Sequence, residues 1–108
     1  MATGFDLQQL ALSLEGTTQA PHFDRTAFKT ARIYVTLAAD GLTANFKFTP
    51  DEQLLKCLVS PDIYTAIPNA WGKQGWTTAN LESMTQADLK FALETAWLHA
   101  LPKPRKKV

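Results

Sequence analysis

The chain has 108 residues, of which 45% are hydrophobic and 19% are charged. This length and composition suit one globular domain and exclude a disordered chain. A single cysteine, Cys57, excludes an internal disulfide and favours a reducing compartment. The first residues lack the basic start of a signal peptide, and no apolar run reaches the roughly 20 residues of a membrane span. We therefore expect a cytoplasmic protein with no membrane partner.

Charge is unevenly distributed behind the net value of +1. The last ten residues hold no acid and four cations, which are Lys103, Arg105, Lys106 and Lys107. Residues 1–98 then hold 7 basic and 10 acidic side chains, a net −3. We predict a single domain over residues 1–102 and a basic, disordered tail over residues 103–108. Two roles are open for the tail: contact with phosphates, or a solvated chain end.

The first predicted element is a helix from Asp6 to Leu14. Its apolar residues recur at helical spacing, beginning with Leu7 and Leu10. Gly16 follows the last apolar position, where a glycine commonly ends a helix.

The strongest strand signal is a hairpin around the turn Asp40–Gly41. Residues 32–37 and 42–48 alternate apolar and polar side chains on either side of it. A two-residue turn places three apolar pairs on one face, which are Leu37 with Ala44, Val35 with Phe46, and Ile33 with Phe48. The opposite face then pairs Tyr34 with Lys47 and Thr36 with Asn45. An earlier strand over residues 27–29 would place Phe28 opposite Ile33 on the core face.

A basic strip follows from the same alternation. Lys29, Arg32 and Lys47 fall on the outward face of these three strands, together with Tyr34. Such a strip is a candidate surface for phosphate contacts. It is equally what a solvated sheet face looks like, so both interpretations stay open.

A second helix is predicted to begin at Thr49, which suits the N-cap position. Pro50 fits the first helical position, and Glu52 completes a capping box. Its predicted buried face consists of Leu54, Leu55 and Leu58. Pro61 ends this helix, and short strands are expected over residues 64–67 and 75–81.

The last helix is the clearest, with Thr85 as N-cap and Asp88 three residues later. Its predicted buried stripe consists of Leu89, Leu93, Ala96, Trp97 and Ala100. Pro102 ends it. The order of helix, three strands, helix, two strands and helix predicts an α+β, two-layer sandwich, with helices covering one face of an antiparallel sheet.

Phe91 and Leu98 lie nearly opposite the buried stripe of this last helix. A helix that covers one sheet face should be polar there. We expect both side chains to be covered by the tail, by a neighbouring loop, by a second copy of the chain or by another protein.

Several stretches together resemble the YjbR/MmcQ family of small bacterial proteins. The matching stretches are Pro21-His22-Phe23, Ala27-Phe28-Lys29, Ile33 to Leu37, Lys47 to Gln53, Gly75-Trp76-Thr77, Ala96-Trp97 and Pro102-Lys103. The resemblance implies a fold similar to the bacterial frataxin homologue, with two terminal helices packed on an antiparallel sheet. It also implies DNA binding, through likeness to a double-wing DNA-binding fold, and it supplies no catalytic residues.

The stretch from Trp71 to Trp76 combines two tryptophans, two glycines and Lys73. Trp71 and Lys73 are candidates for stacking on bases and holding a phosphate, on what we expect to be a flexible loop. The alternative is that Trp76 packs in the sheet and Trp71 covers an edge.

Catalytic and metal-binding signals are weak. His22 and Asp24 could orient an imidazole, but no serine or cysteine nucleophile is signalled beside them, so we interpret His22 as structural. No cluster of His, Cys, Asp and Glu has metal-ligand spacing. The first helix carries only Asp6, with Glu15 at its end, which disfavours iron binding by analogy with frataxin. We expect no catalytic residues, no metal and no cofactor.

The sequence thus favours a small, non-enzymatic binding protein with DNA as the partner, bound weakly and with strong salt dependence. The candidate contacts are the outward strip, the Trp71 stretch and the basic tail. The alternative is a protein-interaction or small-ligand-binding module with no nucleic-acid role, which the acidic body favours.

Overall fold

The computed structural model describes residues 1–102 and shows an α+β protein with two layers. Its helices are α1 (Gly4–Ser13), α2 (Pro50–Val59), α3 (Ala70–Lys73) and α4 (Gln86–Ala100), with a 3-10 turn at Leu81–Ser83. Its strands are β1 (Thr18–His22), β2 (Arg25–Lys29), β3 (Ile33–Leu37), β4 (Thr43–Lys47), β5 (Tyr64–Ala66) and β6 (Trp76–Asn80).

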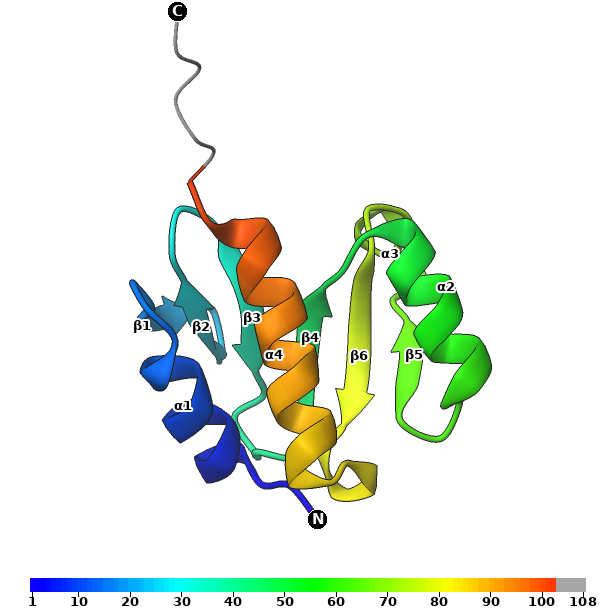
Figure 1. The fold of residues 1–108 in the computed structure, drawn as a ribbon, viewed down its shortest axis with the longest axis horizontal. Helices are drawn as coiled ribbons and strands as arrows, with labels where there is room; N and C mark the ends of the chain where they lie inside the picture. Colours follow the sequence, from blue (N-terminus) through cyan, green and yellow to red (C-terminus); the bar gives the residue numbers. More distant parts are fainter. Residues whose placement is uncertain (103–108) are drawn as a thin grey trace, which may run out of the picture.

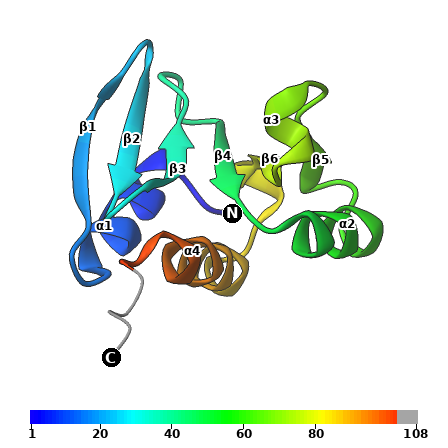
Figure 2. The ribbon, with the colours of Figure 1, turned by 90° about the horizontal axis from the view of Figure 1, so that it is seen from above.

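The six strands form one antiparallel sheet in the order β1-β2-β3-β4-β6-β5. The helices α1, α4 and α2 lie side by side in front of it (Figure 1). Seen from above, α3 lies on the other side of the sheet from these three helices (Figure 2). The predicted α+β sandwich, with the terminal helices on one face of an antiparallel sheet, is confirmed.

β1 is an edge strand that the predicted three-stranded meander lacked. Four of its five residues are exposed, so no alternation of apolar and polar side chains marks it in the sequence. Pro21 fits there, because a proline is tolerated on an edge strand. His22 is the last residue of this strand.

The predicted hairpin register is confirmed near the turn and fails further from it. Val35 pairs with Phe46, Thr36 with Asn45, and Leu37 with Ala44. The β3–β4 ladder ends at Val35, so the two outer predicted pairs are wrong, namely Tyr34 with Lys47 and Ile33 with Phe48.

A β-bulge causes this failure. Phe28 pairs with Val35 and Lys29 with Ile33, which leaves Tyr34 as an extra residue on β3. The predicted pairing of Phe28 with Ile33 is therefore wrong. The bulge changes the alternation of faces along β3. Ile33, which precedes the bulge, therefore lies on the sheet face away from the helices instead of on the same face as Val35.

Tyr34 turns toward α1 and is fully buried, so its predicted place on the outward face is wrong. Its hydroxyl shares a 2.8 Å hydrogen bond with the hydroxyl of Thr17 and lies 3.4 Å from the carbonyl oxygen of Ala11. Burial raises the pKa of Tyr34, and the hydrogen bond with Thr17 acts in the opposite direction.

α2 begins as predicted, but its leucines lie outside the core. Thr49 and Glu52 make both hydrogen bonds of the capping box. The predicted burial of three leucines is wrong, because the exposed fractions are 61% for Leu54, 63% for Leu55 and 71% for Leu58. α2 packs on the edge strand β5, and Gln53 faces inward. Its amide donates to the carbonyl oxygens of Gly72 and Trp76, at 2.9 Å each.

α4 supplies the centre of the core. The residues it buries are Leu89, Ala92, Leu93, Ala96 and Ala100, which confirms four predicted positions and adds Ala92. Trp97 is half-buried, and its indole N–H donates to the carbonyl oxygen of Glu15. The sheet side of this core includes Phe28, Val35 and Phe46.

Phe91 and Leu98 lie on the outer side of α4, as predicted, with exposed fractions of 64% and 61%. Within residues 1–102 no loop covers them, so that expected cover is wrong. Cover by the tail falls outside the described residues. Cover by a second copy or another protein stays a prediction.

Two glycines let α3 approach its neighbours closely. A Cβ on Gly72 would lie 1.6 Å from the carbonyl oxygen of Ile67, and a Cβ on Gly75 would lie 1.9 Å from that of Phe48. Gly75 also has a φ of 107°, which residues with a side chain rarely adopt. The stretch that we expected to be a flexible loop is therefore a short helix and turn that fit tightly against the sheet.

We predict that Gly75→Ala lowers the free energy of unfolding by more than about 3 kcal/mol, because both the positive φ and the contact with Phe48 become unfavourable. Gly16→Ala is the matched control. Gly16 has a φ of 78°, but its Cβ would lie 3.8 Å from the nearest atom, on Thr30. Only backbone strain of about 1–2 kcal/mol is then expected. Urea denaturation followed by circular dichroism measures both, and equal losses would contradict the steric role of Gly75.

Candidate binding groove on the open sheet face

The sheet face opposite α1, α2 and α4 carries a groove of about 530 Å³. In Figure 2 the β1–β2 hairpin and α3 rise on either side of this face. The side chains that line it include His22, Phe23, Asp24, Arg25, Arg32, Ile33, Thr36, Asn45, Trp71 and Trp76. We call this hollow the open-face groove.

The turn between β1 and β2 forms one wall of the groove. Phe23 lies at its tip with 92% of the side chain exposed, and it has a φ of 58°. A non-glycine residue in this left-handed region carries strain of about 1–3 kcal/mol, and such strain concentrates at ligand sites. The ring of His22 contacts that of Phe23 edge-on, with 4.9 Å between centroids. No local pattern in the sequence marks Phe23 as a groove residue.

The opposite wall is α3 with the start of β6. Asn69 caps α3 by accepting a 2.8 Å hydrogen bond from the backbone N–H of Trp71, whose side chain is 59% exposed. Trp76 is half-buried and also lines the groove. Trp76 therefore agrees with the interpretation in which it packs on the sheet. Trp71 instead exposes its aromatic ring to solvent.

The polar side chains that β2, β3 and β4 contribute to the groove are hydrogen-bonded to other side chains or to the backbone. The guanidinium of Arg25 donates to the hydroxyl of Thr36 at 2.8 Å and to its carbonyl oxygen at 3.1 Å. Asn45 accepts a 2.8 Å hydrogen bond from Thr78. Burial lowers the pKa of Arg25, and the nearby carboxylate of Asp24 opposes this effect. Arg25 keeps its charge, since an arginine does not deprotonate in proteins, and its fork is held in place.

The three predicted strip cations lie on this side of the sheet, without Tyr34. Lys29 is exposed and pairs with Ile33, which lines the groove. Arg32 precedes β3 and also lines the groove. Lys47 donates to the carbonyl oxygens of Phe48 and Gln74. Burial lowers the pKa of Lys47, the charge of Arg32 lowers it further, and Glu52 acts in the opposite direction.

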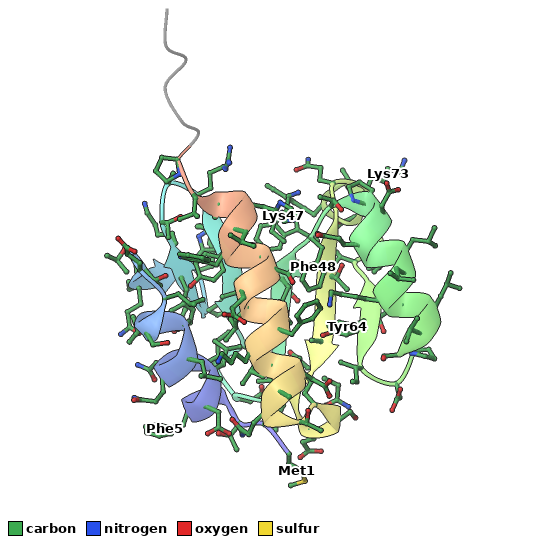
Figure 3. All side chains as sticks on the ribbon, viewed as in Figure 1. Met1, Phe5, Lys47, Phe48, Tyr64 and Lys73 are labelled. Carbon is green, nitrogen blue, oxygen red and sulfur yellow. The ribbon has the colours of Figure 1, made fainter. Side chains whose placement is uncertain are left out.

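Lys73 ends α3 and is exposed, on the element that carries Trp71. Figure 3 shows Lys47 and Lys73 toward the same end of the molecule. The remaining predicted contacts lie outside the described residues, namely Lys103, Arg105, Lys106 and Lys107.

Cations outnumber acids in the open-face groove. Arg25 and Arg32 line it, Lys29 pairs with the groove residue Ile33, Lys47 lines a hollow with Arg32 and the end of α4, and Lys73 ends α3. Among the groove-lining residues, Asp24 is the single acid. The other two lysines of residues 1–102, Lys56 and Lys90, lie on α2 and α4. The groove of this mildly acidic body therefore carries more cations than acids, which the net charge conceals.

A contact between a histidine and a carboxylate joins two helices at the end of the sheet beside Arg32. The imidazole Nε2 of His99 lies 2.9 and 3.0 Å from the two carboxylate oxygens of Glu52, and so joins the end of α4 to the start of α2. Arg32 donates to the carbonyl oxygen of His99 at 2.7 Å. Burial alone would raise the pKa of Glu52, but the hydrogen bonds from Thr49 and His99 outweigh it and lower the pKa.

Residues 1–102 contain no group of three His, Cys, Asp or Glu side chains placed to hold a metal ion. Cys57 is a half-buried free thiol on α2. None of the helices in this part of the chain is long and apolar enough to cross a membrane.

The fold and groove define a small α+β protein with one helix-covered and one open sheet face. The chain belongs to the YjbR family, because the family model described as YjbR matches residues 12–99. No functionally curated protein matches it. Its fold is similar to the crystal structure of protein DR2400 from Deinococcus radiodurans, which carries the domain DUF419. The TM-score is 0.79 and the identity 20%, over 92% of this chain and 78% of that chain.

We predict that Glu52 makes stability fall at acid pH. A carboxylate whose pKa is lower in the folded state contributes stability above its unfolded pKa of 4.5 and loses it as the pH falls through the folded pKa. Glu52→Gln keeps an acceptor for Thr49 but removes the charge, so its unfolding free energy should vary less between about pH 5 and pH 3.

Glu52→Ala is the comparison variant, because it also removes the capping acceptor. It should lower the unfolding free energy by a further ~1 kcal/mol at pH 7. Urea titrations across this pH range measure both variants. An unchanged acid slope in Glu52→Gln would contradict the role assigned to the carboxylate.

Proposed function

We propose that the protein is a small, non-enzymatic binding protein whose open-face groove holds a single strand of nucleic acid. One observation carries this proposal. The two most exposed aromatic side chains of the groove, Phe23 and Trp71, stand on opposite walls, and two cations, Arg25 and Arg32, line the groove with them.

The chemistry suits an unpaired strand better than a duplex. Bases stack on aromatic side chains with about 1–3 kcal/mol per base, and this contact needs a base whose face is free. In a duplex the base faces are already stacked on one another. Phe23 and Trp71 offer two platforms for splayed bases, and Lys29 and Arg32 offer partners for the phosphates between them.

Family resemblance adds support for DNA in particular, through the double-wing likeness. The basic tail would add sequence-independent phosphate contacts beyond the groove. The single cysteine, Cys57, fits a protein of the reducing cytoplasm, and the cytoplasm also contains single-stranded nucleic acid.

A second candidate is a planar small molecule held in the same groove. Ile33 and Trp76 line the groove beside Arg25, whose guanidinium is held by a hydrogen bond to Thr36. This arrangement favours a small-molecule ligand, because small-molecule sites combine apolar walls with a few well-placed polar groups. The two candidates differ in salt dependence, since a neutral planar ligand releases no counterions.

We predict that Trp71→Ala weakens binding of a fluorescein-labelled single-stranded oligonucleotide by about 1–3 kcal/mol, because one stacked base loses its platform. Phe91→Ala is the matched control, since Phe91 is similarly exposed but lies on the outer side of α4. Fluorescence anisotropy with the full-length chain measures both. If the two variants lose affinity equally, the groove is not the binding site.

The salt dependence tests the cations separately. Lys29→Ala should reduce the steepness of log affinity against log salt by about 0.7, the contribution of one phosphate on a single strand. Lys90→Ala, an equally simple change on α4, should leave the slope unaltered. Truncation after Pro102 removes four cations and should reduce the slope by up to about 3. Failure of the full-length chain to bind any oligonucleotide at about 50 mM salt would overturn the nucleic-acid proposal.

A further inference from the structure

The outer face of α2 and α4 exposes an unusual number of large apolar side chains. Each is between 61% and 71% exposed, and they are Leu54, Leu55, Leu58, Val59, Phe91 and Leu98. The two helices stand side by side on the same side of the sheet (Figure 1). We call these six residues the helical apolar face.

A groove of about 210 Å³ runs between the two helices within this face. Leu55, Lys56 and Val59 line it from α2, Asp88 and Phe91 line it from α4, and Ile63 lines it from the loop after α2. Figure 3 shows Phe48 and Tyr64 between the two helices. The two helices contribute apolar side chains, and one charged side chain each, to this channel, and such a channel suits the mode in which an amphipathic helix binds in a groove.

The exposed area is large enough to anchor a stable contact. Six large side chains exposed to this degree present on the order of 600 Å² of apolar surface, the upper end of the range for the largest patch on a monomer. A protein–protein interface of standard size buries about 800 Å² on each partner. The helical apolar face would therefore supply most of the apolar area that this protein contributes to such an interface. Such surfaces on soluble proteins mark interaction sites.

The charge around the face selects the partner. The acids on α2, on α4 and in the loop after α2 are Asp51, Glu52, Asp62, Asp88 and Glu94, against the lysines Lys56 and Lys90. The ammonium of Lys56 is enclosed by rings, at 4.9, 5.2 and 4.7 Å from the centroids of Phe48, Tyr64 and Phe91. The rim that a partner meets is therefore predominantly acidic.

An acidic rim disfavours a second copy of the chain and an anionic lipid surface. A two-fold contact of this face with itself would bring two predominantly acidic rims together, and like charges across an interface are costly. The same acids complement a partner with basic side chains beside its apolar stripe.

We propose that the helical apolar face docks a basic, amphipathic helix of another protein. Leucine-type side chains of that helix fill the channel between α2 and α4, and its flanking lysines or arginines face the acidic rim. This site lies on the opposite side of the sheet from the open-face groove, so it does not rest on nucleic-acid binding. With both faces occupied, the protein joins a basic helical partner to the ligand of the groove.

A designed peptide of about 18 residues is the probe, long enough to form a helix, with leucines at i, i+3, i+4 and i+7 repeats and lysines beside them. One control peptide replaces every lysine with glutamate, and another scrambles the order to destroy the apolar stripe. Anisotropy with the full-length protein should show the lysine peptide binding at least about tenfold more tightly than either control.

Two variants locate the site. Leu58→Gln and Phe91→Gln should each weaken the lysine peptide by about tenfold or more, since both remove apolar contact area from the face. Leu12→Gln on α1, also an exposed apolar residue, is the matched control and should leave the affinity unchanged. Thermal melting of each variant checks that the fold is retained, and Leu58, at 71% exposed, is the safer substitution in this respect.

Three results would overturn the proposal. The first is equal binding of the lysine and glutamate peptides, which would show that the acidic rim selects nothing. The second is an unchanged affinity in both Leu58→Gln and Phe91→Gln. The third is a stable dimer of the isolated protein in sedimentation velocity that Phe91→Gln dissociates, which would assign the face to a second copy.

Discussion

The close packing of α4 on the middle of the sheet is the contact on which the rest of the fold depends. Ala92, Ala96 and Ala100 alternate with Leu89 and Leu93 on its buried side, so the helix approaches β3 and β4 closely. One helix therefore covers the two central strands, and α1 and α2 are left to cover the flanks. α2 lies over the three-residue strand β5, which offers little apolar surface, and its leucines remain in water.

Features set by a few neighbouring residues could be predicted from the sequence. The caps at Thr49 and Thr85 depend on a side chain three positions away, and both form as expected. The turn at Asp40–Gly41 fixed the pairing next to it, since Gly41 takes the positive φ of 73° that such turns need. Of the groove, Arg32 and Trp71 were identified because a cation on an outward strand position and an aromatic in a glycine-rich stretch are visible locally.

Features set by distant partners could not be predicted. The bulge at Tyr34 depends on the pairing of β2 and on a hydroxyl partner, Thr17, that belongs to another part of the chain. The pattern of α2 indicated an apolar face correctly, but the sequence does not say whether sheet or solvent lies against it. Phe23 and Arg25 were missed because their role follows from the β1–β2 hairpin, and β1 carries no alternating pattern.

The attachment of α2 has a consequence for the dynamics of the protein. Contacts that hold α2 to the body include the amide of Gln53, the contact of the Glu52 carboxylate with His99, and the cation–π contact of Lys56. The leucines of α2 are already hydrated, so release of the helix would newly expose mainly Cys57 and the rings of Phe48 and Tyr64 that lie under Lys56. We therefore expect local opening of this helix to require less free energy than global unfolding of the sheet and α4.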